Sequence, residues 1–112
     1  MSDFLLSLFN MATTVRALQS DEPVIIYGAG GTGRKVLRVL LKQGKQPLAF
    51  IDEYAKSNIV EGIPVFTLAD QALPRKATVI VAVFNRENNA RFSGVESRLH
   101  SAGFPSVLSF EQ

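Results

Sequence analysis

The sequence lacks cysteine and tryptophan altogether and contains a single histidine among its 112 residues. Without cysteine the chain can form no disulfide bond and offers no thiolate as a nucleophile or a metal ligand. One histidine also leaves few of the ligand sets that bind zinc in proteins. We therefore expect no metal site in this chain.

Charge of either sign is scarce as well. Twelve Lys and Arg residues against ten Asp and Glu leave a formal net charge of +2, so the sequence does not indicate nucleic-acid binding. The composition is 46% hydrophobic and 20% charged, which argues against disorder. At this length the chain is the size of one ordinary domain.

The N-terminal segment resembles neither a signal peptide nor a bilayer span. It carries an acidic residue, Asp3, where a signal peptide is positively charged, and polar residues interrupt its apolar run. Helical spacing predicts an amphipathic helix within residues 1–22 that docks on the rest of the domain or forms a homodimer interface. The apolar face of this helix consists of Phe4, Leu8, Met11, Val15 and Leu18. We expect a cytoplasmic protein without a membrane span.

A glycine-rich turn is the most informative feature that the sequence does contain. The apolar run 24–27 predicts a buried strand, and a helical pattern is under way by Arg34. Between them stands the pattern G-x-G-x-x-G that is typical of dinucleotide-binding βαβ units. The pattern comprises Gly28, Ala29, Gly30, Gly31, Thr32 and Gly33. We expect these residues to bind a nucleotide, with Arg34 within reach of a phosphate.

Each glycine of the motif has a separate predicted role. Gly28 permits the tight turn from strand to helix, Gly30 lets the backbone approach a pyrophosphate, and Gly33 lets the helix pack closely on the strand. The helix N-terminus then offers unpaired N–H groups and the positive end of its dipole to an anion. The alternative is a scaffold that keeps the turn without binding a ligand.

Asp52 supplies the acidic residue that accompanies this motif. It follows a second predicted strand, residues 47–51, and stands 19 positions after Gly33. Near this spacing a carboxylate accepts hydrogen bonds from the ribose hydroxyls of a dinucleotide. A carboxylate also repels a 2′-phosphate, so NAD is favoured over NADP. The alternative interpretation is that Asp52 only opens the turn Asp52-Glu53-Tyr54.

Strand and helix patterns alternate along the rest of the chain. Further strands are predicted at 63–66, 78–84 and 107–110, and helices at 32–43, 67–73 and 87–102. The first helix is expected to turn Val36, Leu37, Leu40 and Leu41 inward. The alternation predicts an α/β fold, a Rossmann-like doubly wound parallel sheet of about five strands in the order 3-2-1-4-5. Pro64 favours an edge position for its strand. Residues 23–112 would then form a nucleotide-binding domain, a piece of a larger protein.

Ligands of such sheets bind beyond the carboxyl ends of the strands, where the strand order reverses. In the predicted order this crevice lies between the first and fourth strands, which adds Phe84 and Asn85 to the candidate site. Phe84 packs on a ligand ring or completes the core, and Asn85 contacts the ligand or caps the following helix. His100 falls late in the last helix, away from the crevice, and we assign it no catalytic role.

A complete catalytic arrangement is not evident. The sequence offers no Ser/Tyr/Lys set, no paired carboxylates in a plausible cleft and no nucleophile with a base. An oxidoreductase also needs a place for its substrate beside the nicotinamide, which a second domain usually supplies. We therefore expect a binding module without catalytic residues of its own, which works with a downstream catalytic domain.

Three stretches resemble the N-terminal Rossmann-like domains of several glycan-related enzymes. They are YGAGGTGR at 27–34, AFIDE at 49–53 and EGIPVF at 61–66. The N-terminal helix and the later segment VAVFNRE at 81–87 look most like the domain that precedes FkbM-type methyltransferases. The chain is also similar to the N-terminal domain of bacterial sugar O- and N-acyltransferases and to the nucleotide-binding part of polysaccharide-biosynthesis epimerases and dehydratases.

The resemblance implies a nucleotide or nucleotide-sugar site at Gly28, Gly30, Gly33 and Asp52. Many of the similar domains carry consecutive aspartates where this chain continues from Asp52 with Glu and Tyr. The expected function is a module that binds NAD or a nucleotide-sugar and supports a larger carbohydrate-modifying or methyl-transferring enzyme. Two alternatives stay open: the NAD-binding domain of an oxidoreductase or epimerase, and a non-binding structural or dimerisation module.

Overall fold

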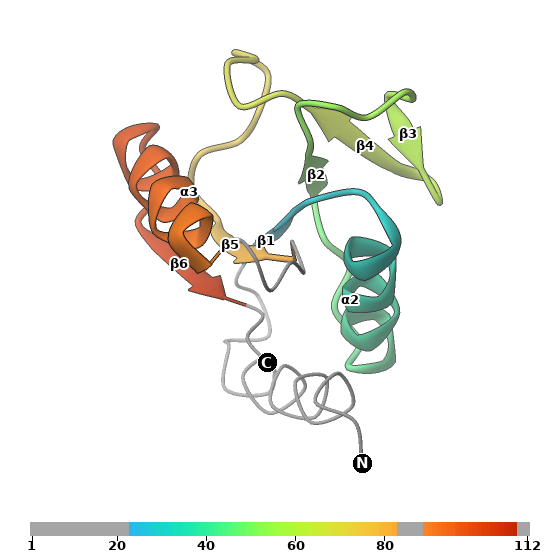
Figure 1. Cartoon of the computed structure of the whole chain (residues 1–112). Coiled ribbons are helices and arrows are strands. Elements are labelled where there is room, and N and C mark those ends of the chain that lie inside the picture. The colour runs from blue at the N-terminus through green and yellow to red at the C-terminus, as the bar shows by residue number, and fades with distance from the viewer. Residues whose placement is uncertain (1–22, 83–88, 110–112) are drawn as a thin grey trace.

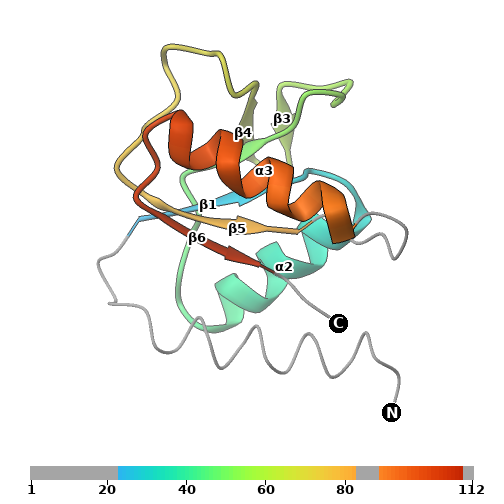
Figure 2. The same cartoon turned by 60° about the vertical axis from the view of Figure 1, so that its left-hand side comes forward.

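The centre of the molecule is a six-stranded sheet. The computed structural model describes residues 23–82 and 89–109, without the side chains of residues 89–93 and 109. Within this part the strand order is β3-β4-β2-β1-β5-β6, and one helix covers each face of the sheet (Figure 1, Figure 2). The helix predicted within residues 1–22 lies outside the described residues.

The chain builds the sheet from alternating strands and helices. The strands are β1 (Val24–Tyr27), β2 (Ala49–Ile51), β3 (Ile59–Val60), β4 (Ile63–Phe66), β5 (Thr78–Val81) and β6 (Ser106–Ser109). The helices are α2 (Gly31–Lys42) and α3 (Asn89–Ser101). Neighbouring strands pair in parallel except β3 and β4, which are antiparallel. The predicted α/β class is confirmed.

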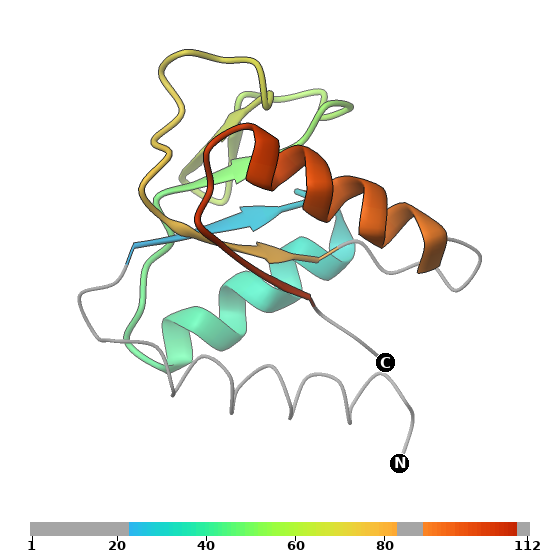
Figure 3. The same cartoon turned by 90° about the vertical axis from the view of Figure 1, so that its left-hand side faces the viewer.

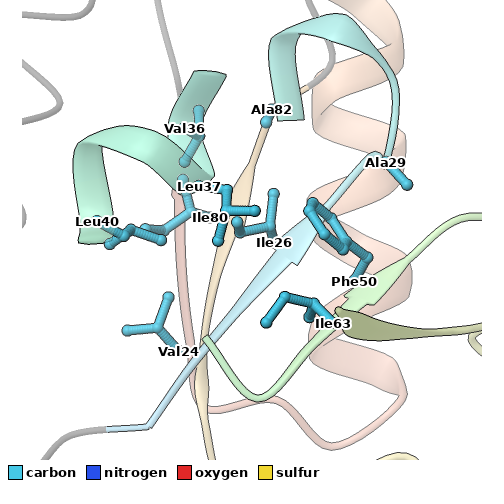
Figure 4. Close-up of a cluster of buried hydrophobic side chains, with 10 residues drawn as sticks. All are labelled: Val24, Ile26, Ala29, Val36, Leu37, Leu40, Phe50, Ile63, Ile80 and Ala82. Carbon is cyan, nitrogen blue, oxygen red and sulfur yellow. The ribbon is translucent and has the colours of Figure 1, made fainter. Parts of the chain in front are cut away.

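The central strands β1 and β5 are buried along their whole length. Successive residues of a strand point to opposite faces of its sheet, so these strands fill two separate cores. The core on the α2 side includes Val24, Ile26, Val36, Leu37, Leu40, Phe50 and Ile80 (Figure 4). The core on the α3 side includes Ile25, Tyr27, Val79, Val81, Leu99 and Phe104. Figure 3 shows the sheet between the two helices. Because both faces of β1 and β5 are covered, these strands are apolar at successive residues instead of alternating between apolar and polar.

Helix α2 packs on the sheet by one stripe of its surface. Val36, Leu37 and Leu40 are buried as predicted, whereas Leu41, which was also expected to face inward, is 50% exposed. With about 100° of rotation per residue, Val36, Leu37 and Leu40 fall within one sector of the helix surface about 100° wide, and Leu41 falls about 40° outside it. Leu41 therefore lies beside the buried stripe rather than within it, and its predicted inward position is wrong.

A short hairpin makes the strand count and the strand order differ from the prediction. Strand β3 forms between the predicted strands 47–51 and 63–66, where the sequence predicts no strand, and it lies outside β4 at one edge of the sheet. The two residues between β3 and β4, Glu61 and Gly62, have φ angles of 49° and 80°. Positive φ at both central residues is what a tight type I′ hairpin turn requires. The predicted edge position of Pro64 is also wrong, because β3 covers its strand.

The segment between β4 and β5 contains turns instead of the predicted helix at 67–73. The N–H of Asp70 donates to the Thr67 carbonyl at 3.1 Å, and the Asp70 carboxylate accepts the N–H of Ala72 at 2.9 Å. The guanidinium of Arg75 donates to the carbonyl of Leu68 at 2.9 Å and to that of Asp70 at 3.2 Å. These contacts use backbone groups that a helix would pair internally, so the prediction of a helix here is wrong.

Candidate functional site

The glycine turn joins β1 to α2 at the carboxyl end of the central strand (Figure 1). Gly28 begins the turn with a φ of 107°, a conformation that side chains rarely adopt. Its N–H donates to the carbonyl of Ile51 at 2.7 Å, which ties the turn to the end of the neighbouring strand β2. Gly28 therefore has a conformational requirement for glycine.

Gly33 has a steric requirement for glycine. A Cβ atom added at Gly33 would lie 1.8 Å from the backbone oxygen of Gly28 and 3.5 Å from a ring carbon of Phe50. The first turn of α2 thus rests directly on the backbone at the end of β1. This close packing of helix on strand is the role that the sequence motif predicts for its third glycine.

Gly30 and Gly31 have neither requirement. Gly30 is the N-cap of α2 with φ −80° and ψ −161°, an ordinary extended conformation that any residue adopts. A Cβ at Gly30 or Gly31 would meet no atom within 4 Å in the part of the chain that the structure describes. The helix start also lacks a capping side-chain hydrogen bond and has no acidic residue in its first turn. The described fold does not explain why both positions are glycine.

The carboxylate of Asp52 connects the glycine turn to the end of β2. Oδ2 of Asp52 accepts the N–H of Ala29 at 2.8 Å, and Oδ1 accepts the N–H of Tyr54 at 2.8 Å. The second of these bonds is the turn-opening contact that sequence reasoning gave as the alternative role of Asp52. A carboxylate offers about four lone-pair sites, so two remain for a ligand. Asp52 is only partly buried.

A second polar group lies on the α3 side of the sheet. Arg98 of α3 donates from Nη2 to the hydroxyl of Tyr27, the last residue of β1, at 3.3 Å. Burial raises the pKa of the Tyr27 phenol above its ordinary value of 10.0, and the nearby carboxylates of Glu53 and Asp52 act in the same direction. The positive charge of Arg98 acts against this rise. Tyr27 is therefore a buried neutral phenol.

We expect this phenol to make the fold sensitive to alkaline pH. Because its pKa is higher in the folded chain than in the unfolded chain, its contribution to stability is fully present below about pH 10 and is lost as the pH rises through the folded-state pKa. Urea unfolding at increasing pH should therefore show a steeper loss of stability for the native chain than for Tyr27→Phe. Parallel losses in the two chains would contradict this account.

The structure brings most of the predicted site residues to one edge of the sheet. The turn residues Gly28, Ala29, Gly30, Gly31, Thr32 and Gly33 lie beside Asp52 through the bond to Ala29. Arg34 is exposed on the first turn of α2. Phe84 and Asn85 lie outside the described residues. His100 is elsewhere, near the end of α3, where its Nδ1 lies 3.0 Å from the carbonyl oxygen of Phe104.

Two features of the site escaped sequence reasoning. The bond between Asp52 and Ala29 joins residues 23 positions apart, so no local pattern signals it. The exposed side chain of Tyr54 has no sequence signal either, apart from its place directly after the acidic pair. Among the described residues, no group of three His, Asp or Glu side chains could hold a metal ion. Neither described helix is long and apolar enough to cross a bilayer.

These features define an α/β domain with a glycine turn and a carboxylate at the carboxyl edge of a mostly parallel sheet. The family model of the PglD N-terminal domain matches residues 23–93, more than half of the chain. The chain therefore belongs to the PglD N-terminal domain family, which is the N-terminal domain of a sugar acyltransferase. No match was found among curated proteins. The resemblance to sugar-modifying enzymes is thus confirmed, but the matched family is not specifically the FkbM-associated domain.

Proposed function

We propose that this chain is a nucleotide-sugar-binding module of a sugar acyltransferase, with the glycine turn and Asp52 as its binding site. The module holds the sugar substrate by its nucleotide, while a downstream catalytic domain performs the acyl transfer. The family supports the sugar-modifying setting. An acyl transfer to a sugar needs no hydride carrier, so a nucleotide-sugar suits this setting better than NAD.

The observation that carries this proposal is the unexplained pair of glycines at the start of α2. Neither backbone conformation nor neighbouring atoms among the described residues require glycine at Gly30 or Gly31. Side chains at these positions would, however, stand between a ligand and the open N–H groups of the helix. A pyrophosphate that approaches the backbone closely would explain why both positions are glycine. The helix dipole favours the negative charge of such a group.

Asp52 completes the proposed site at the ribose. Its two bonds to backbone N–H groups fix the carboxylate in place before any ligand arrives. A carboxylate that is already oriented loses little side-chain entropy when it accepts ribose hydroxyls with its remaining lone pairs. The proposed ligand therefore lies with its pyrophosphate over Gly30 and its ribose at Asp52.

A purely structural module is the second candidate, and one observation favours it. Both oxygens of Asp52 already accept hydrogen bonds from the chain itself, so the residue has a role without a ligand. For the same reason Asp52→Ala is a poor test of ribose binding, because it also removes the acceptor of the Ala29 N–H. The experiment therefore has to compare ligands on the native chain.

A thermal-shift titration of the full chain tests the proposal. The ligands are a UDP-sugar, NAD, NADP and S-adenosylmethionine, each raised to saturation. A ligand at about 100 times its dissociation constant stabilises the folded state by about 2.7 kcal/mol. We expect a saturable shift with the UDP-sugar. A shift with NAD alone would favour an oxidoreductase or epimerase domain, and no shift with any ligand would favour the structural module.

A further inference from the structure

Tyr54 has the most exposed large hydrophobic side chain in the described part of the chain. It is 93% exposed, whereas the other large exposed hydrophobic residues in the described part, Leu41, Leu48 and Ile59, are 43–57% exposed. The second tyrosine of the chain, Tyr27, is buried in the core on the α3 side. The ring of Tyr54 therefore offers both of its faces to a binding partner.

The backbone of Tyr54 is nevertheless held in a defined place. Its N–H donates to Oδ1 of Asp52, and the other oxygen of the same carboxylate accepts the N–H of Ala29 in the glycine turn. One carboxylate thus fixes Tyr54 on one side and the glycine turn on the other. The backbone of Tyr54 is thus linked to the glycine turn through two hydrogen bonds of 2.8 Å each.

We propose that Tyr54 is a stacking platform for the base of the bound nucleotide. This inference rests on the proposed function. In a nucleotide the ribose separates the phosphates from the base, so phosphates at Gly30 and a ribose at Asp52 direct the base away from the glycine turn. Tyr54 is held by Oδ1 of Asp52, whereas the glycine turn is held by Oδ2 of the same carboxylate. Aromatic side chains stack on any base, since every base has a π-face.

The composition of the chain allows a direct optical test. The chain contains no tryptophan and two tyrosines, so Tyr27→Phe leaves Tyr54 as the sole source of tyrosine fluorescence. This substitution keeps the buried ring and removes only the hydroxyl that contacts Arg98. We expect UDP to quench the fluorescence of Tyr27→Phe saturably, and inorganic pyrophosphate, which has no base, to leave it unchanged. Free tyrosine amide in the same UDP solutions corrects for absorption by the base.

Affinity measurements on Tyr54 variants supply the second readout. Stacking of one base on an aromatic side chain changes affinity by about tenfold in alanine substitutions. We therefore expect calorimetry to show that Tyr54→Ala binds UDP about tenfold more weakly than the native chain. The control Tyr54→Phe keeps the ring and should bind UDP as the native chain does. Pyrophosphate should bind the native chain and both variants equally.

The outcomes separate this inference from the proposed function. If UDP binds the native chain but causes no quenching and binds Tyr54→Ala equally well, the platform is overturned and the nucleotide site stands. If Tyr54→Ala weakens pyrophosphate as much as UDP, Tyr54 supports the turn rather than the base, which also overturns the platform. If no nucleotide binds the native chain at all, both proposals fail.

Discussion

Gly33→Ala is expected to lower the free energy of unfolding by about 3 kcal/mol, at the upper end of the range for overpacked sites. The added Cβ would lie 1.8 Å from the backbone oxygen of Gly28. A flexible side chain could move away from such a contact, but here the obstacle is backbone at the end of the central strand. Helix α2 would have to separate from β1, and the core around Phe50 would loosen with it.

Urea unfolding followed by circular dichroism measures this effect, and Gly31→Ala is the matched control. Gly31 lies two residues earlier, where an added Cβ meets no described atom within 4 Å. Alanine also favours a helix over glycine by up to about 1 kcal/mol. We therefore expect Gly31→Ala to be as stable as the native chain or more so. Equal destabilisation by both substitutions would contradict the close packing at Gly33.

Gly30→Ala is expected to have the opposite profile, with a nearly unchanged fold and a large loss of nucleotide affinity. The conformation of Gly30 suits alanine, and alanine stabilises the fold because it lowers the conformational entropy of the unfolded chain. Alanine is, however, a poorer N-cap than glycine, which destabilises the fold. These two effects oppose each other, so the stability should change by less than about 1 kcal/mol. A methyl group against a bound pyrophosphate costs about 1–3 kcal/mol, or roughly fivefold to more than a hundredfold in dissociation constant.

Gly30→Ser separates binding from folding still further. Serine supplies the N-cap hydroxyl that α2 lacks, so this variant should be at least as stable as the native chain. Its side chain occupies the same space and should weaken UDP-sugar binding as alanine does. Thermal melts with and without the UDP-sugar measure both properties in one series. Full ligand-induced stabilisation of both variants would show that no ligand approaches Gly30.

The glycine turn could be predicted from the sequence because its requirements are local. Gly28 needs a positive φ, and Gly33 needs room against Gly28, only five residues away. The buried strands were also predictable, since β1 and β5 are covered on both faces and carry uninterrupted apolar runs. Fold class and the core of the candidate site therefore follow from patterns within short windows.

The features that escaped prediction depend on distant contacts or on unusual turn chemistry. The hairpin before β4 places Glu61 at a φ of 49°, and its Glu-Gly sequence lacks the Asn or Asp that usually indicates such a turn. The side chain of Arg38 from α2 forms an ion pair with Glu61 at 3.2 Å across the fold. Arg75 likewise binds carbonyls of the segment predicted as a helix. Sequence periodicity contains no information about such partners.

The measurement that tests the central claim most directly is a nitrogen-15 NMR titration of the full chain with a UDP-sugar. Amide signals report each residue separately, so they locate a ligand as well as detect it. The account predicts saturable shifts that are largest at the amides of Gly30, Gly31 and Gly33 and extend to Asp52 and Tyr54. Unchanged amides across the glycine turn at high UDP-sugar concentration would contradict it and leave the turn as a structural element.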